Sequence, residues 1–279
     1  MNQLFLIITL LVISSVSVAV FKLYVFYTPI SIPAQTINLE TPIINESKVD
    51  TVEIPQIIKN LNETNSKITG LTCDRLHIVI REGVFSFSLK GYLRYEKEKN
   101  FRMIVGSMLA KELDLGSNNQ VFWFWSRKNK DPGLFYAKHE DYFKTRLKTP
   151  FNPVWIMKSL GIDVIDTQNV KIIDEPGKNI MVIQLTKNAS SIPIVSTTFI
   201  DKTTSKIRSI VTTDTQGKIL ISIEIKEYEN NLPRHIVYTW FEENKIMEFK
   251  LINPRTGNKS NPQLWEMPNM DQETDMGIE

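Results

Sequence analysis

Apolar and polar side chains alternate through the stretch Val84-Phe85-Ser86-Phe87-Ser88-Leu89-Lys90-Gly91-Tyr92-Leu93-Arg94-Tyr95. Phe85, Phe87, Leu89, Leu93 and Tyr95 form the apolar set, and Ser86, Ser88, Lys90 and Arg94 form the polar set. A period of two is typical of a strand with one buried and one solvated face. This stretch therefore predicts an antiparallel sheet whose outer face is polar.

Strand patterns of the same kind continue on the C-terminal side of this stretch. Ile219, Ile221, Ile223 and Ile225 share one face, for example, and turn residues such as Asp214 and Gly217 separate the segments. Further strands are expected at Phe101–Val105, Val121–Trp125, Leu134–Ala137, Asn179–Thr186, Ile194–Asp201, Lys206–Thr213, Lys218–Tyr228, Arg234–Glu242 and Lys245–Ile252. One-sided strands in sequential hairpins predict a sheet that curves around an apolar side.

Two segments have helical patterns. After Pro55, apolar residues recur at helical spacing, and the series extends a few turns further: Ile54, Ile57, Ile58, Leu61, Ile68 and Leu71. Pro153–Leu160 has proline at an early helical position and Gly161 at its end. We expect a mainly β (α+β) fold, an unclosed antiparallel β-barrel or strongly curved sheet. Two or three helices would plug its concave face.

The chain is expected to have four parts: 1–27, 28–53, 54–268 and 269–279. The first is a signal peptide or an N-terminal membrane anchor, because Leu4–Phe21 is apolar and uncharged. Both alternatives stay open: Ser17-Val18-Ala19 offers a cleavage site, whereas Leu23–Tyr27 prolongs the apolar run. The second is a proline-containing linker, the third is the curved-sheet domain, and the fourth is an acidic flexible tail.

The composition and the motifs argue against nucleic-acid binding and catalysis. The net charge is +2, and no stripe of Lys and Arg is evident. Cys73 is the only cysteine and would be a buried thiol; His77 nearby does not make it a nucleophile without an oxyanion hole. In His139-Glu140-Asp141, neighbouring side chains of a strand point to opposite faces, which disfavours a metal site. We therefore predict no catalytic residues, no metal and no cofactor.

A resemblance to a known family rests on the order of several short motifs. Gly91–Arg102 resembles the early strand pair of the periplasmic lipoprotein carriers, the LolA/LolB-like family, in which a Gly-x-Leu strand is followed by a basic-Pro turn and an aromatic residue. Gly116–Asn119 and Phe122-Trp123 follow in the family's order, and Leu264–Pro268 resembles its closing strand, so the resemblance covers Ile54 to Pro268. It implies an unclosed barrel, plugged by helices, with an apolar interior for the acyl chains of lipoproteins.

The resemblance and the alternation together nominate the site residues. The lipid-binding cavity would be lined by Leu93, Tyr95, Phe101, Met103, Val105, Trp123 and Trp125, and a lid would present Trp155, Ile156 and Leu160. The basic residue of the family's turn, which can latch a lid helix, falls at Lys97, without the planar fork of arginine. Two other interpretations stay open: Val121–Trp125 as a central strand packed on both faces, and Pro153–Leu160 as an ordinary core helix.

The sequence therefore predicts a non-enzymatic envelope protein, periplasmic or extracytoplasmic, that is membrane-anchored or secreted. It would bind an amphipathic lipid or the acyl chains of lipoproteins, contact the membrane through its N-terminal segment, bind no nucleic acid and be a monomer. The alternative is a membrane-tethered interaction or sensor module of the same fold with a packed interior. The volume of the cavity should distinguish the two.

Overall fold

The structure is a computed structural model that describes the second of two units, Met1–Ile44 and Asn45–Glu279. It describes residues 53–97, 99–107, 110–127, 133–139, 141, 153–168, 170–175, 177, 179–187, 193–257, 261–269 and 273–275. The predicted anchor or signal, 1–27, and the linker up to residue 52 lie outside these residues. Within the described part of the chain, no helix is long and apolar enough to cross a membrane.

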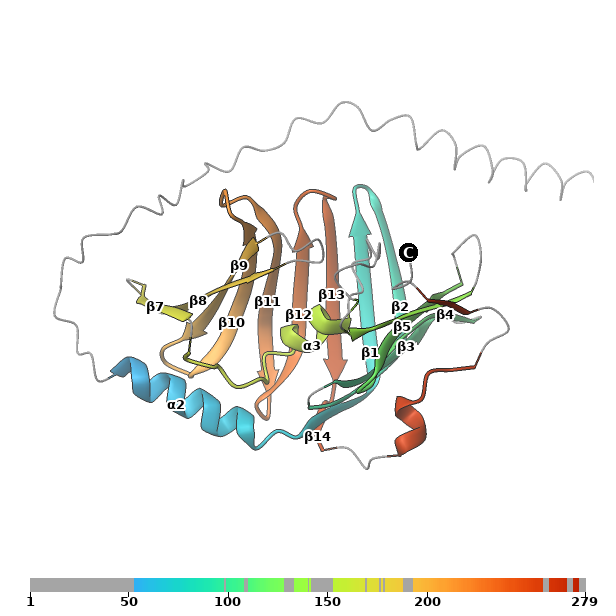
Figure 1. Ribbon diagram of the computed structural model, residues 1–279, viewed down its shortest axis with the longest axis horizontal. Helices are drawn as coiled ribbons and strands as arrows, with labels where there is room; N and C mark the ends of the chain where they lie inside the picture. The colour runs from blue at the N-terminus through green and yellow to red at the C-terminus, as the bar shows by residue number, and fades with distance from the viewer. Residues whose placement is uncertain are drawn as a thin grey trace, which may run out of the picture. The chain divides into compact units, whose positions relative to one another are not determined.

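The described unit is built on one 15-stranded sheet (Figure 1). Its strands are β1 (Gly70–Glu82), β2 (Phe85–Glu96), β3 (Asn100–Gly106), β4 (Lys111–Ser117), β5 (Val121–Ser126), β6 (Leu134–Lys138), β7 (Val170–Asp174), β8 (Asn179–Lys187), β9 (Pro193–Asp201), β10 (Lys206–Asp214), β11 (Ile219–Glu229), β12 (Leu232–Trp240), β13 (Lys245–Ile252), β14 (Arg255–Thr256) and β15 (Glu273–Asp275). The spatial order is β15-β6-β5-β4-β3-β2-β1-β13-β12-β11-β10-β9-β8-β7, with β14 beside β1. Because β15 and β7 are its two ends, the sheet is not closed, and the prediction of an unclosed curved sheet is confirmed.

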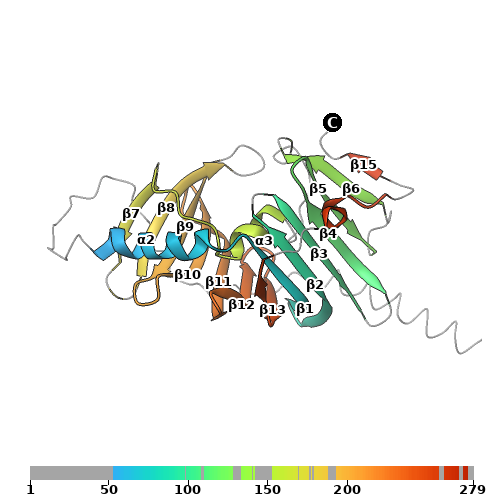
Figure 2. The same cartoon turned by 90° about the horizontal axis from the view of Figure 1, so that it is seen from below.

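Two helices cover the concave side of this sheet. Helix α2 (Glu53–Ser66) lies across β7–β11, and α3 (Pro153–Ser159) lies over the middle strands (Figure 2). The apolar residues of α2 pack on β8–β11, and those of α3 pack in a larger cluster with β1–β5 and β11–β13. Ile210 on β10 contacts both clusters. The two clusters therefore form one continuous layer between the helices and the sheet.

The first strand was missed in the sequence. Ile68 and Leu71 were interpreted as a continuation of the helix, whereas α2 ends at Ser66 and β1 begins at Gly70. The register of β1 against β2 shifts between Cys73 and Leu76, which is a β-bulge. One extra residue breaks the period of two, so β1 does not show a continuous alternation along its length. The strands β4 (Lys111–Ser117) and β7 (Val170–Asp174) were also missed in the sequence.

The C-terminal region also differs from the prediction. Leu264–Pro268 was interpreted as a closing strand, but the structure has a 3-10 helix, η2 (Pro262–Trp265), followed by extended chain. The tail from residue 269 was expected to be flexible, yet Glu273–Asp275 forms β15, which pairs with β6 in parallel. Three polar residues show no strand pattern of their own, and their pairing depends on the exposed edge that β6 offers.

Candidate functional site

The concave face of β2 and β3 brings five of the predicted cavity residues together. They are Leu93 and Tyr95 on β2, and Phe101, Met103 and Val105 on β3. The strand register pairs Leu93 with Met103 and Tyr95 with Phe101. All five are buried and belong to one apolar cluster. The structure thus places them on a common surface, and their role in binding a lipid stays a prediction.

Trp123 and Trp125 lie on the opposite, convex face of the sheet. Phe124 pairs with Leu115, which in turn pairs with Met103, so Phe124 is the residue of β5 that faces the concave side. Neighbouring residues of a strand point to opposite faces, and both tryptophans therefore point outward. Their placement in one cavity with the other five residues is wrong, because an all-apolar strand does not show which alternate residues face inward.

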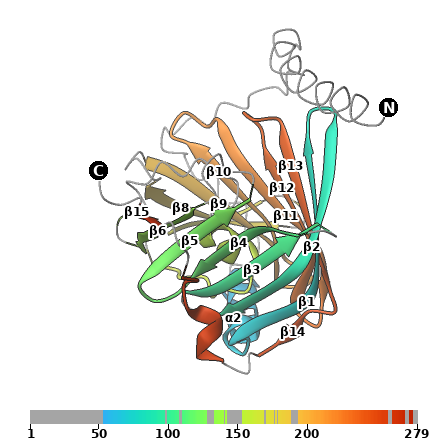
Figure 3. The same ribbon diagram turned by 90° about the vertical axis from the view of Figure 1, so that its right-hand side faces the viewer.

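The C-terminal segment packs on the convex face beside Trp123 (Figure 3). The guanidinium of Arg102 lies 5.1 Å from the centroid of the Trp123 ring and donates a hydrogen bond to the carbonyl of Glu266 at 2.8 Å. Arg102 also forms an ion pair with the fully buried Asp114 at 2.8 Å. The contact between Arg102 and Glu266 fastens the C-terminal segment to β3, and Trp123 and Trp265 are both buried there.

Helix α3 covers the concave face where the lid was predicted. Ile156 and Leu160 are fully buried and, with Met157, belong to the same apolar cluster as the five cavity candidates. Lys158 lies on the exposed side of the helix. The backbone of Trp155 is part of α3, but its side chain lies outside the described residues, so its anchoring role stays a prediction. The helix therefore occupies the surface that an acyl chain would contact.

The end of α3 is held by a polar contact and a tight turn. The hydroxyl of Tyr238 on β12 donates to Ser159 Oγ, which itself donates to the carbonyl of Ile156 at 2.6 Å. Gly161 follows with a φ of 64°, the left-handed conformation in which helices commonly end. A Cβ at Gly161 would also lie 2.5 Å from Ile225 Cδ1. The backbone of the turn after α3 thus favours glycine, and a side chain there would also displace the tip of Ile225.

Lys97 contacts a helix carbonyl, but the helix is α2 and not α3. Its ammonium donates a hydrogen bond to the carbonyl of Asn65 in the last turn of α2. Carbonyls at a helix C-terminus carry partial negative charge, which favours a cation there. The backbone N–H of Lys97 donates to the carbonyl of Thr69 at 2.9 Å. Burial lowers the pKa of Lys97, and the Asp163 carboxylate opposes that shift.

Two asparagines fasten α2 to the segment that follows α3. Asn62 Nδ2 donates to the carbonyl of Ile165 at 3.0 Å, and the Ile165 N–H donates back to Asn62 Oδ1 at 2.7 Å. Asn65 Nδ2 donates to the carbonyls of Gly161 at 3.3 Å and Asp163 at 2.8 Å. We call these two residues the asparagine clamp. Through the clamp, the end of α3 is connected to α2 as well as to the sheet.

The sequence reasoning missed the clamp, although a signal for it existed. Asn62 and Asn65 each follow a buried residue, Ile58 and Leu61, by four positions and so lie on the same helix face. A polar side chain in line with buried ones needs a hydrogen-bond partner inside the fold. The clamp could therefore have been expected, but its partners in the loop 161–165 could not.

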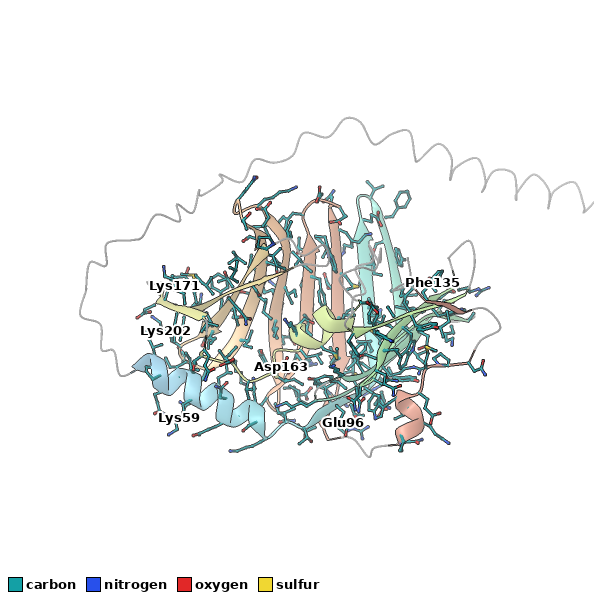
Figure 4. All side chains as sticks on the ribbon, in the orientation of Figure 1. Lys59, Glu96, Phe135, Asp163, Lys171 and Lys202 are labelled. Atoms are coloured by element: carbon teal, nitrogen blue, oxygen red, sulfur yellow. The ribbon has the colours of Figure 1, made fainter. Side chains whose placement is uncertain are left out.

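Asp163 lies between the two helices and contacts a cavity candidate (Figure 4). The hydroxyl of Tyr95 donates to Asp163 Oδ1 at 3.2 Å. Burial raises the pKa of Asp163, whereas the hydrogen bond from Tyr95 and the charges of Lys97 and Lys158 oppose the shift. Burial also raises the pKa of Tyr95, and the Asp163 carboxylate adds to that shift. This loop is not recognisable from the sequence as part of a site.

A small polar pocket lies between the end of α2 and the turn from β9 to β10. Its volume is about 40 Å³, and Asn65, Gly161, Lys206 and Tyr228 contribute to its lining. This volume holds a few water molecules, and an acyl chain needs far more. The concave face under α3 is filled by buried side chains. In this structure, therefore, an acyl chain reaches that face only if α3 moves.

The two clusters that were considered for chemistry have structural partners. Cys73 is buried, and burial raises the pKa of its thiol, so the reactive thiolate is disfavoured. His139 Nε2 lies 2.6 Å from the carbonyl of Asn118, and burial lowers the pKa of the imidazole. Glu140 lies outside the described residues. Among the residues that the structure describes, no three His, Cys, Asp or Glu side chains come together as metal ligands would.

Comparison with solved structures finds the same fold at very low sequence identity. A domain from Vibrio parahaemolyticus, described as an outer membrane lipoprotein-sorting protein, is 11% identical, with a TM-score of 0.52 over 74% of this chain and 94% of that chain. A DUF1329 family protein from Desulfovibrio piger is 8% identical, with a TM-score of 0.53 over 76% and 95%. A LolA superfamily protein from Nitrosomonas europaea is 6% identical, with a TM-score of 0.51 over 76% and 97%.

No protein-family model matches the chain, and no curated protein matches it in sequence. At these identities the structural matches show a shared fold and leave the ligand to be established. The chain has the fold of the LolA-like lipoprotein-sorting proteins, as its resemblance to that family predicted.

Proposed function

We propose that the protein binds the acyl chain of an amphipathic lipid or lipoprotein on the concave face, with α3 as a lid that moves aside. The observation that carries this proposal is the position of α3. A helix of 7 residues and the residue after it bury Ile156, Met157 and Leu160 in the same apolar cluster as Leu93 and Met103. The fold shared with lipoprotein-sorting proteins supports it.

The energies allow such an exchange. Each fully buried side chain of this kind contributes about 1.5–3 kcal/mol, so docking the apolar side of α3 contributes on the order of 5–9 kcal/mol. A buried methylene contributes about 0.8 kcal/mol, so an acyl chain of about fourteen methylenes contributes about 11 kcal/mol. An acyl chain can therefore replace α3 on the sheet with little net cost. No bond is made or broken in this process, and no catalytic group is needed.

The location proposed for this activity is the cell envelope, outside the cytoplasm. The uncharged apolar segment Leu4–Phe21 supports export or anchoring. The linker that follows would hold the folded unit near the membrane, where lipids and lipoproteins are found.

The deciding experiment changes the lid and measures ligand affinity and stability together. Full-length protein carrying Ile156→Ala and Leu160→Ala is titrated with a fluorescent lipopeptide that bears one palmitoyl chain. Each truncation should lower the free energy of unfolding by about 2–5 kcal/mol. If α3 competes with the ligand, the same changes lower the Kd, by about tenfold for every 1.4 kcal/mol of lost lid docking. If α3 is an ordinary core helix, the same two changes lower both the stability of the protein and its affinity for the lipopeptide.

A matched control separates the effect of a lid residue from that of a buried residue in the sheet beneath it. Ile236 on β12 is equally buried in the same cluster, but it belongs to the sheet. Ile236→Ala should lower stability without lowering the Kd. Should the double lid variant fail to fold, Ile156→Val makes the same comparison at a cost of about 0.5–1.5 kcal/mol. An unchanged or higher Kd in a folded lid variant contradicts the proposal that α3 is a lid.

The second candidate is a tethered interaction or sensor module with a filled interior. The closed concave face and the small volume of the polar pocket favour it. In that case the lipopeptide does not bind, either to the unmodified protein or to the lid variants. The same titration therefore decides between the two functions.

A further inference from the structure

Exposed apolar side chains gather at one end of the sheet, at the turns between neighbouring strands. The turns β1–β2, β12–β13 and β10–β11 all lie at this end, because the strands β2, β1, β13, β12 and β11 are adjacent and antiparallel. We call this end the turn rim. Its exposed fractions are 93% for Val84, 53% for Phe85, 41% for Phe87, 44% for Phe241 and 40% for Ile219.

The hairpin between β1 and β2 is the most prominent part of the turn rim (Figure 3). Gly83 has a φ of 57°, which a two-residue hairpin turn requires at this position, and Val84 is the other residue of the turn. Polar residues are usual at such an exposed turn, and the turn does not need the apolar side chain of Val84. Phe85 and Val84 together therefore present an apolar tip to the solvent.

The apolar tip continues into the core along β2. Phe85, Phe87, Leu89, Leu93 and Tyr95 share the concave face of β2; Phe85 and Phe87 are exposed, Leu89 is half-buried, and Leu93 and Tyr95 are buried. Phe87 pairs with the buried Ile80. An apolar strip thus leads from the turn rim to the surface that α3 covers, without a charged side chain on that face of β2.

Several charges around the turn rim are paired with one another. Lys245 lies 3.3 Å from Glu82, and Lys218 lies 3.5 Å from Glu242. Arg81 pairs with Glu248. A surface with paired charges does not attract a strongly acidic partner. Its exposed apolar groups suit a neutral, apolar environment instead.

We propose that the turn rim docks on a lipid bilayer, with Val84 and Phe85 inserted at the level of the headgroups. Apolar groups on separate projecting turns suit a soft lipid surface better than a partner protein, whose interface needs about 800 Å² of complementary surface per side. The apolar segment Leu4–Phe21 adds a second reason, since it would bring the chain to a membrane. A flexible chain as long as the linker that the sequence predicts at 28–53 would span about 30 Å, which allows contact between the turn rim and the membrane.

This docking rests on the exposed turn rim and holds whether or not the concave face binds an acyl chain. If both hold, the apolar strip of β2 connects the bilayer with the covered surface. Docking through apolar insertion has a distinctive consequence: it needs no anionic lipid and withstands salt, unlike binding by a basic patch.

The test uses a nitroxide spin label in full-length protein reconstituted into phosphatidylcholine vesicles. Cys73 is the only native cysteine and is buried, so the label attaches at an introduced cysteine. Val84→Cys places it at the tip, and Val164→Cys places it at another exposed valine, at the opposite end of the sheet beside the asparagine clamp. Collisions with oxygen, which enriches in lipid, are compared with collisions with a water-soluble nickel chelate.

Docking predicts that the label at position 84 collides mainly with oxygen and the label at position 164 mainly with the chelate. This result should persist at high salt. Phe85→Asp in the Val84→Cys protein should lower the oxygen preference severalfold, whereas Ile252→Asp, at an exposed residue of another strand end, should leave it unchanged. Equal, water-like collisions at positions 84 and 164 overturn the proposal. So does shielding from both reagents that increases with protein concentration, since a second copy would then cover the turn rim.

Acyl binding is measured separately with the lipopeptide titration. A bilayer contact at position 84 without lipopeptide binding supports the docking and removes the proposed function. Lipopeptide binding with a water-exposed label at position 84 supports the proposed function and overturns the docking.

Discussion

Removal of the Asn65 side chain should loosen the attachment of α3. The Asn65→Ala change deletes two hydrogen bonds, to the carbonyls of Gly161 and Asp163, from a residue that is only 6% exposed. A net hydrogen bond contributes about 0.5–1.5 kcal/mol, and a carbonyl left buried without a partner costs more. The gain in helix propensity is below about 0.7 kcal/mol, and small in a last turn. We therefore expect a loss of about 2 kcal/mol in the free energy of unfolding.

Asn60→Ala provides the control on the same helix. Asn60 is exposed, and its side chain accepts a hydrogen bond from Gln56 at 2.8 Å on the solvent side. The same substitution there removes a solvent-exposed contact and gains helix propensity, so the free energy of unfolding should change by less than about 0.5 kcal/mol. The two variants differ in one respect, the connection between α2 and the segment after α3.

Two measurements check the prediction in the full-length protein. Thermal unfolding followed by circular dichroism should show a melting temperature lower by about 4–8 °C for Asn65→Ala, on the scale of about 2–4 °C per kcal/mol for a domain of this size. Hydrogen exchange should show faster exchange in 153–165 than in the strands. Equal melting temperatures for the two variants, or an acceleration of exchange spread evenly over the sheet, would refute the role of the asparagine clamp.

Three further predictions concern other contacts. Because burial raises the pKa of Asp163, the folded protein binds this proton more tightly than the unfolded chain; stability should therefore increase as the pH falls through the folded pKa, and Asp163→Asn should remove that increase in denaturant unfolding across pH. Gly116→Ala should lower the free energy of unfolding by about 1–3 kcal/mol, because the new Cβ would lie 2.0 Å from the Trp123 ring; an unchanged urea midpoint would mean that the ring shifts freely. Arg102→Leu should lower the free energy of unfolding by about 1.5–3 kcal/mol, because the buried Asp114 loses this charged hydrogen bond but still has Lys111 at 3.1 Å; Arg102→Leu with Asp114→Leu should recover much of that loss in a double-mutant cycle.

The concave face of the sheet is covered in this structure. The five cavity candidates on β2 and β3 are buried by α3 and by neighbouring strands, so their surface is apolar but not open. A closed apolar surface is what both a carrier at rest and a filled scaffold would show. The response of the affinity to truncation of Ile156 and Leu160 separates them, because only a lid competes with a ligand.

The sequence by itself determined the strands that alternate without interruption and the two helices. In β2, in β13 and in the part of β11 from Ile219 to Ile225 the period of two is intact, so these stretches could be recognised locally as strands. The helix from Pro153 could be placed because proline begins it and glycine follows it. These features depend on neighbouring residues alone, which is why no tertiary information was needed.

Only the tertiary structure decided how distant segments meet. The direction of the Trp123 ring follows from pairing with β4, since Val121–Trp125 is apolar at every position. The asparagine clamp joins positions that are 96–103 residues apart, and β15 forms on an edge that β6 provides. Hydrogen bonds and packing between segments far apart in the chain leave no local pattern, because their geometry exists only once the sheet has folded.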